Sequence, residues 1–164
     1  MNRKELTTKL AYNRWANHRL LRSAAALPSE AFSKDMGGSF GSVQGTLLHL
    51  LWAEWGWLHH WQHGSFVPDF PLDDFATVAA LEESWLELEK AQLAFIEPLT
   101  DADLLGTHAV DEYLYTLGEL IHHLLNHSTY HRGQVALLLR QLDQKPPSTD
   151  FRLFLTESRY GATY

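Results

Sequence analysis

The sequence predicts an all-α protein, a four-helix bundle that forms a single domain over residues 1–164. Four long segments repeat apolar residues at helical spacing, and no segment shows the clear apolar–polar alternation of a half-buried strand. Turn-forming residues separate these segments. A hydrophobic fraction of 45% with 20% charged residues is ordinary for a globular protein and excludes an intrinsically disordered chain.

The first two helices are expected over residues 2–27 and 40–63. Pro28 ends the first helix, because proline lacks the amide hydrogen and disfavours helical geometry at the residue before it. The second helix begins after a serine that can accept a hydrogen bond from the first turn, and both Ser39 and Ser42 fit that role. Its middle is almost entirely apolar, which is typical of a helix buried in a core.

The last two helices are expected over residues 76–97 and 116–142. Pro98 ends the earlier one. The later one starts with a capping box, in which the Thr116 hydroxyl and the Glu119 carboxylate each satisfy a backbone amide of the first turn.

The segments between the predicted helices limit how the bundle can be connected. Turn-rich stretches occupy residues 35–38 and 68–71, and residues 143–164 are expected to form a short C-terminal tail. The connection over residues 64–75 can span ~40 Å at about 3.3 Å per residue. A 24-residue helix is only ~36 Å long. The sequence is therefore compatible with a bundle that has at least one crossover connection.

Composition narrows the classes of function. The chain has 10 histidines and no cysteine, which excludes disulfides, a cysteine nucleophile and thiolate metal sites. A metal would have to be held by histidine and carboxylate. The net charge of -7 argues against nucleic acid as a partner, because phosphate binding needs a basic face. No secretory signal and no membrane-spanning apolar run is visible, so we expect a cytoplasmic protein with no membrane partner.

His127 and His131 are the strongest chemical signal. Their i,i+4 spacing puts the two Cβ atoms ~5–6 Å apart on one helix face. Both imidazoles could therefore reach one ion at about 2.0–2.1 Å. They also interrupt the apolar stripe of the last helix, where a buried imidazole without a partner would be costly. The alternative is two core histidines that are satisfied by hydrogen bonds, or a chance pair in a histidine-rich chain.

His49 lies in the apolar middle of the second long helix, ~21 Å from its end. The midpoint of His127 and His131 lies ~18 Å from the start of the last helix. If these two helices are adjacent and antiparallel, the three imidazoles meet at one level of the core. Three histidines without a fourth protein ligand are typical of a catalytic rather than a structural metal site.

The other histidines fit the site less well. His123 shares the face of His127 but is ~12 Å along the helix from His131, so it is at most a pocket residue. A rival pair with i,i+4 spacing, His59 and His63, lies beside His60 at a helix C-terminus, where histidine simply complements the helix dipole. Three more show no partner pattern: His18, His108 and His122.

Three motifs carry a resemblance to a known family. Residues 126–135, with the sequence NHSTYHRGQV, resemble the signature of the DinB family, part of the DinB/YfiT-like superfamily of metalloenzymes. The sequence VQGTLLHL over residues 43–50 resembles the motif of the second long helix, and YNRWAN over residues 12–17 that of the first. The resemblance covers roughly residues 3–142 and weakens in the tail.

This resemblance implies an up-down-down-up four-helix bundle that binds one divalent metal on a histidine triad, here His49, His127 and His131. It implies zinc or nickel, sometimes iron, and a homodimer. Three neutral imidazoles do not themselves discriminate among these metals. Relatives include thiol S-transferases that use bacillithiol or glutathione, a mycothiol-dependent isomerase and metal-dependent hydrolases.

The sequence thus favours a metal-dependent enzyme that joins a small-molecule substrate, a low-molecular-weight thiol, to an electrophile. Three side chains are candidates for the surroundings of the metal: His123, Tyr130 and Gln134. Arg132 is expected to point away from the ion, toward a helix interface. No catalytic residue can be assigned. The alternatives are a metal-dependent hydrolase, for which no general base is evident near the triad, and a non-catalytic metal-binding or stress-response protein.

Overall fold

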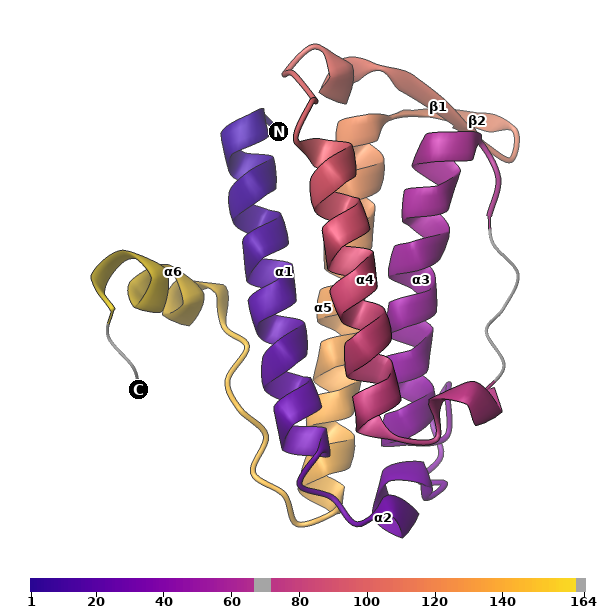
Figure 1. The fold of residues 1–164 in the computed structure, drawn as a ribbon, viewed down its shortest axis with the longest axis vertical. Coiled ribbons are helices and arrows are strands. Elements are labelled where there is room, and N and C mark those ends of the chain that lie inside the picture. Colours follow the sequence, from indigo (N-terminus) through magenta and orange to yellow (C-terminus); the bar gives the residue numbers. More distant parts are fainter. Residues whose placement is uncertain (67–71, 162–164) are drawn as a thin grey trace.

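The computed structural model describes residues 1–66 and 72–161 and contains the expected bundle of four long helices (Figure 1). An apolar core lies between them, and short elements cover the ends of the bundle. The all-α fold class is therefore confirmed. The four helices are α1 (Arg3–Ala24), α3 (Val43–His63), α4 (Val78–Ile96) and α5 (Leu117–Gln141).

Hydrogen bonds at the helix ends define the topology. The Arg3 guanidinium donates to the Glu97 carbonyl at 2.7 Å, so α1 starts where α4 ends and the two are antiparallel. The Gln44 amide donates to the Phe75 carbonyl at 3.0 Å, so α3 and α4 start at the same end and run parallel. Figure 1 shows α5 running in the direction of α1, which makes the bundle up-down-down-up. The turn-rich stretch over residues 68–71 lies outside the described residues.

The first half of the bundle differs from the predicted bounds. α1 ends at Ala24, three residues before the predicted end at residue 27, and a separate short helix, α2 (Ser29–Ser33), follows Pro28. The two helices are separate because Pro28, the N-cap of α2, has an extended ψ of 146° and no amide hydrogen with which to continue α1. α3 begins at Val43 rather than at residue 40, because the Ser42 hydroxyl accepts from the Gly45 amide at 2.9 Å.

In the second half of the bundle, the helix bounds agree more closely with the predicted bounds. α4 starts after Thr77, whose hydroxyl accepts from the Ala80 amide, and ends one residue before the predicted end. The predicted capping box of α5 is present, with the Thr116 amide donating to the Glu119 carboxylate at 2.8 Å. Local capping chemistry therefore determines where these helices begin.

A β-hairpin before α5 corrects the expectation that the chain has no strand. Strands β1 (Thr107–Val110) and β2 (Tyr113–Thr116) pair antiparallel across a two-residue turn. Each strand has four residues and no fully buried face, so the sequence lacks the alternation that predicts a strand. Two single-turn 3₁₀ helices were also missed, η1 (Leu72–Phe75) and η2 (Asp103–Leu105).

A sixth helix, α6 (Phe151–Tyr160), lies within the predicted C-terminal tail, where no helix was expected among the four long ones. Asp150 caps it, and its buried Phe154 packs against Tyr12 and Trp15 of α1. The Glu157 carboxylate accepts from the Trp15 indole at 2.8 Å. The helix was missed because its ten residues offer a short apolar stripe, and its position depends on contacts with α1.

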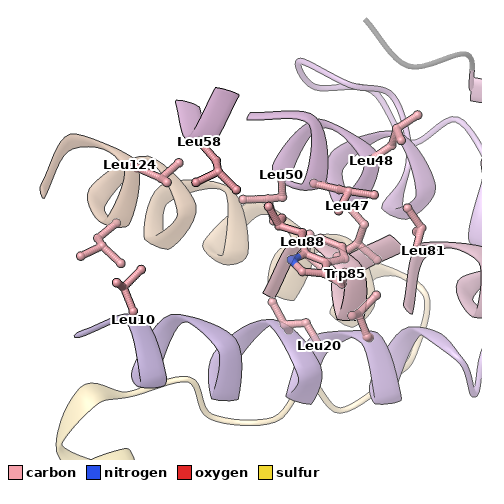
Figure 2. Close-up of a cluster of buried hydrophobic side chains, with 14 of the residues drawn as sticks. Leu10, Leu20, Leu47, Leu48, Leu50, Leu58, Leu81, Trp85, Leu88 and Leu124 are labelled. Carbon is pink, nitrogen blue, oxygen red and sulfur yellow. The ribbon is translucent and has the colours of Figure 1, made fainter. Parts of the chain in front are cut away.

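Leucines from every long helix form the core, and Trp85 of α4 is fully buried among them (Figure 2). Leu47 and Leu50 of α3 approach Trp85, with Leu20 of α1 on the other side. This packing fixes α3 relative to its neighbours and therefore fixes where His49 lies. None of the helices in the described part of the chain is long and apolar enough to cross a membrane.

Candidate metal centre

Three imidazoles converge between α3 and α5. His127 Nε2 lies 3.2 Å from His49 Nε2 and 3.2 Å from His131 Nε2. One nitrogen of each ring lies within 4.8 Å of the other two, and the described residues contain no other such group of three metal-binding side chains. The structure thus brings together the three histidines that the sequence nominated.

The helix geometry explains this convergence. α3 and α5 pack side by side and run in opposite directions, which is the arrangement that the depth argument required. His127 and His131 stand one turn apart on α5, so their rings lie 4.4 Å apart between centroids. His49 approaches from α3, with its ring centroid 4.6 Å from that of His131.

Two neighbours hold the imidazoles in place. The Phe40 ring, from the loop before α3, stacks on His49 at a centroid distance of 3.9 Å and an angle of 16°. It also meets the His131 ring edge-on at 5.3 Å. Gln134 Oε1 lies 2.7 Å from His131 Nδ1 and accepts its proton. That hydrogen bond leaves the lone pair of His131 on Nε2, which faces the other two rings.

Burial and the neighbouring imidazoles keep two of these three rings uncharged at neutral pH. Burial, followed by the neighbouring imidazole of His131, lowers the pKa of His49 to about 4. The pKa of His127 also falls to about 4, chiefly through burial and then through the neighbouring imidazoles. Neutral imidazole is the form that binds a metal, so no proton has to be removed from these two rings at neutral pH.

The donor set fits a divalent ion. Two ligand nitrogens about 2.0–2.1 Å from a tetrahedral ion are ~3.3 Å apart, close to the 3.2 Å separations found here. Three histidine nitrogens occupy three tetrahedral positions and leave the fourth to water or substrate. The two rings on α5 and the ring on α3 are therefore the residues that would hold the ion.

A buried polar network lies beside the trio and was not predicted. The Glu54 carboxylate, 1% exposed, accepts from the amides of Asn13 and Asn17 at 2.8 Å each. It also accepts from Gln92 at 3.1 Å and from Ser128 at 3.4 Å. Four hydrogen-bond donors therefore occupy this carboxylate.

Arg132 completes this network from α5. Its guanidinium donates to the amide oxygens of Asn13 and Asn17, the latter at 2.9 Å, and to the Thr129 hydroxyl at 2.8 Å. The expectation that Arg132 points away from the ion toward a helix interface is confirmed. Asn13 and Asn17, four residues apart inside a buried helix face, were the sequence signal for such a network.

The three residues predicted to surround the metal differ in how they contact the three imidazoles. Gln134 contacts the trio directly, as described above. His123 is exposed, and its ring lies 6.0 Å from the ring of His127 without a bond to it. Tyr130 is 67% exposed and meets the His131 ring edge-on at 5.0 Å.

The remaining histidines form no second group of three among the described residues. The rings of His59 and His63 lie 4.5 Å apart and are tilted by 51°, but His59 Nδ1 bonds the Ser65 carbonyl at 2.6 Å. His60 is buried against Phe66 instead of simply capping the helix end. His18, for which no partner was predicted, forms an ion pair with Glu89 of α4 at 2.8 Å.

Known proteins resemble the chain over most of its length. Protein DinB of Bacillus subtilis (strain 168) is 25% identical over 154 residues, which cover 88% of this chain and 90% of that protein. The uncharacterized protein YizA of the same organism is 26% identical over 137 residues, covering 76% and 80% of the two chains.

A crystal structure shows the same fold. It is that of a DinB-like protein from Bacillus cereus ATCC 10987, with a TM-score of 0.60 and 18% identity, covering 82% of this chain and 91% of the other. The profile of the DinB family matches residues 1–160. Because this match spans almost the whole sequence, the chain belongs to the DinB family.

Proposed function

We propose that the chain is a divalent-metal enzyme that transfers a low-molecular-weight thiol to an electrophilic small molecule. The observation that carries the proposal is the convergence of the three Nε2 atoms of His49, His127 and His131 with a fourth position left open. The resemblance to the DinB family favours zinc or nickel, with iron as the alternative, and all three accept neutral imidazole ligands.

A bound divalent ion would supply a Lewis acid that lowers the pKa of a thiol at the open position. The protein supplies the remaining requirements. Gln134 keeps the His131 lone pair on Nε2, and the Phe40 ring holds His49 in one orientation. In the transfer, sulfur forms a bond to the electrophilic carbon while the leaving group departs with its bonding electrons, and the thiol proton passes to solvent.

Thiol transfer is favoured over hydrolysis by the state of Glu54. A metal hydrolase ordinarily uses a carboxylate to accept a proton from water. The Glu54 carboxylate accepts from four buried side chains of α1, α4 and α5, so its hydrogen-bonding capacity is already used. A thiol has a much lower pKa than water and needs no such base once the ion is present.

The test uses protein loaded with zinc, nickel or iron, a thiol and 1-chloro-2,4-dinitrobenzene as the electrophile. We expect a metal-dependent rate with glutathione, bacillithiol or mycothiol, followed by the absorbance of the thioether. His131→Ala should abolish it, whereas His63→Ala, in the pair at the end of α3, should not. No rate above that of the metal-free protein with any of these thiols would refute the proposal. Hydrolysis of a nitrophenyl ester without thiol would support the hydrolase instead.

A further inference from the structure

A cavity of about 300 Å³ lies next to the imidazole trio, between the loop before α3 and the second half of α5. Its apolar wall includes Met36, Phe40, Leu137 and Leu138. Its volume is at the lower end of the range for pockets that bind small molecules. The mechanism proposed above uses none of this space.

Two side chains belong both to the cavity and to the surroundings of the trio. Phe40 lines the cavity and stacks on His49 at 3.9 Å. Gln134 lines the cavity and bonds His131 Nδ1 through its oxygen at 2.7 Å. A molecule in the cavity would therefore contact the same two groups that orient the imidazoles, and it would lie adjacent to the metal centre.

The residues that line the cavity also favour an uncharged occupant. None of the residues that line the cavity is charged. An ion that leaves water for this lining would lose part of its hydration without gaining a counter-ion, which is unfavourable. The Asp35 carboxylate, close by in sequence, accepts from the Gly37 amide at 2.9 Å and is not part of the lining. An uncharged occupant with an apolar body avoids this cost.

Polar side chains in the lining can orient that occupant: Ser39, Thr46, Gln134 and Gln141. The Thr46 hydroxyl is committed to the Ser42 carbonyl at 2.8 Å. The Gln134 oxygen is committed to His131, but its amide hydrogens can donate. The cavity therefore offers an apolar wall and an amide donor, which suits an aromatic or aliphatic molecule that carries a hydrogen-bond acceptor.

We propose that this cavity binds the electrophilic substrate, an uncharged and largely apolar molecule with a hydrogen-bond acceptor directed at Gln134. The inference rests on the proposed function, in which a thiol occupies the open metal position. It divides the two substrates between two places: the thiol at the ion, the electrophile against Phe40 and Leu137.

Binding is tested first in metal-free protein without thiol, by amide chemical-shift changes. The probes are 1,3-dinitrobenzene, an unreactive uncharged analogue of the assay electrophile, and 3,5-dinitrobenzoate, which adds one negative charge. We expect the uncharged probe to shift Gly37, Gly38 and Gln134 and to bind at least about tenfold more tightly than the anion. Leu137→Asp should weaken its binding by about tenfold or more. Leu93→Asp, at a similarly exposed leucine of α4 outside the cavity, should leave binding unchanged.

A second measurement tests adjacency to the metal centre. Protein loaded with Co²⁺ should increase the relaxation rate of the 1,3-dinitrobenzene protons relative to Zn²⁺-loaded protein, and Leu137→Asp should remove the increase. The inference is overturned if the uncharged probe does not bind, if the anion binds as tightly, if Leu137→Asp has no effect, or if the bound probe shows no increase. Because the first measurement needs neither metal nor thiol, it can succeed when thiol transfer fails.

Discussion

Gln134 acts on the candidate metal centre through His131, at the side of the ring opposite to the converging nitrogens. Its oxygen accepts the Nδ1 proton at 2.7 Å, which fixes both the tautomer and the rotation of the ring. A hydrogen bond of this kind raises the basicity of the imidazole without adding a ligand. The contribution of Gln134 should therefore be visible in metal affinity more than in folding.

We expect Gln134→Leu to weaken zinc binding about 10- to 100-fold while the unfolding temperature changes little. The measurement is a competition titration of the metal-free protein against a chromophoric chelator. Tyr130→Phe is the matched control, because this exposed neighbour touches His131 only through its ring. Equal affinities for Gln134→Leu and wild type would show that the hydrogen bond is incidental.

At the residue scale, the sequence predicted the contacts between residues that lie on the same helix. His127 and His131 lie one turn apart on α5, so their proximity follows from helix geometry alone. The Glu54 network was invisible because its partners come from α1, α4 and α5, and no spacing within one helix relates them. Gln134 was only a weak candidate, since many glutamines follow histidines by three residues without bonding them.

The ion pair between His18 and Glu89 joins α1 to α4 and should make the stability of this contact depend on pH. The Glu89 carboxylate, chiefly through its bond to the imidazole, raises the pKa of His18 above the usual 6.5. Burial and Arg22 act in the opposite direction, and Glu82 adds to the rise. A raised pKa means that the folded state holds the proton more tightly than the unfolded state.

The stabilisation is therefore complete below the unfolded pKa of about 6.5 and is lost as the pH rises through the folded value. We expect wild type to exceed His18→Gln in unfolding free energy at about pH 5.5, with the gap narrowing toward about pH 8.5. Urea titrations of both proteins across this range measure the gap. A gap that stays constant or widens with pH would exclude a charged pair at this contact.

Arg132 links α5 to α1 inside the core, where its removal should be costly. Without the guanidinium, the amide oxygens of Asn13 and Asn17 lose a charged donor, and the Glu54 carboxylate keeps a buried negative charge. We expect Arg132→Met to lower the unfolding free energy by about 3–5 kcal/mol, measured by urea denaturation.

Arg140→Met is the control for this prediction, because Arg140 is exposed on the same helix and should cost less than about 0.5 kcal/mol. Adding Glu54→Gln to Arg132→Met removes the unpaired charge and should recover part of the loss. If the two single variants are additive, the carboxylate and the guanidinium do not interact through the asparagines.

At the scale of elements, the long helices were predictable and the short elements were not. The four long helices carry proline or capping signals at their ends, together with several turns of apolar periodicity. α6 forms because Phe154, Glu157 and the surface of α1 fit together, and the hairpin depends on pairing between four-residue strands. Such elements depend on partners distant in the sequence, or have too few residues to show a period.

At the scale of the whole molecule, the up-down-down-up order explains why a metal should stabilise the fold. α3 and α5 are separated in the sequence by α4 and the hairpin, so the candidate ligands His49 and His131 come from distant parts of the chain. The sequence showed only that the connection between α3 and α4 is long enough for a crossover. The prediction of the metal site assumed that α3 and α5 are adjacent and antiparallel, and did not derive it. An ion bound to all three histidines would join these two helices across the core.

A ligand that binds only the folded state stabilises it by about 2.7 kcal/mol at a concentration 100 times the Kd. For a chain of this length, that corresponds to a rise of about 5–11 °C in unfolding temperature. We expect zinc or nickel to produce this rise in metal-free wild type, and His49→Ala/His131→Ala to abolish it. His59→Ala/His63→Ala removes the same number of imidazoles from the end of α3 and should keep the full rise. If this control loses the rise and the first double variant keeps it, the ion binds at the end of α3, and the converging imidazoles are core residues held by hydrogen bonds.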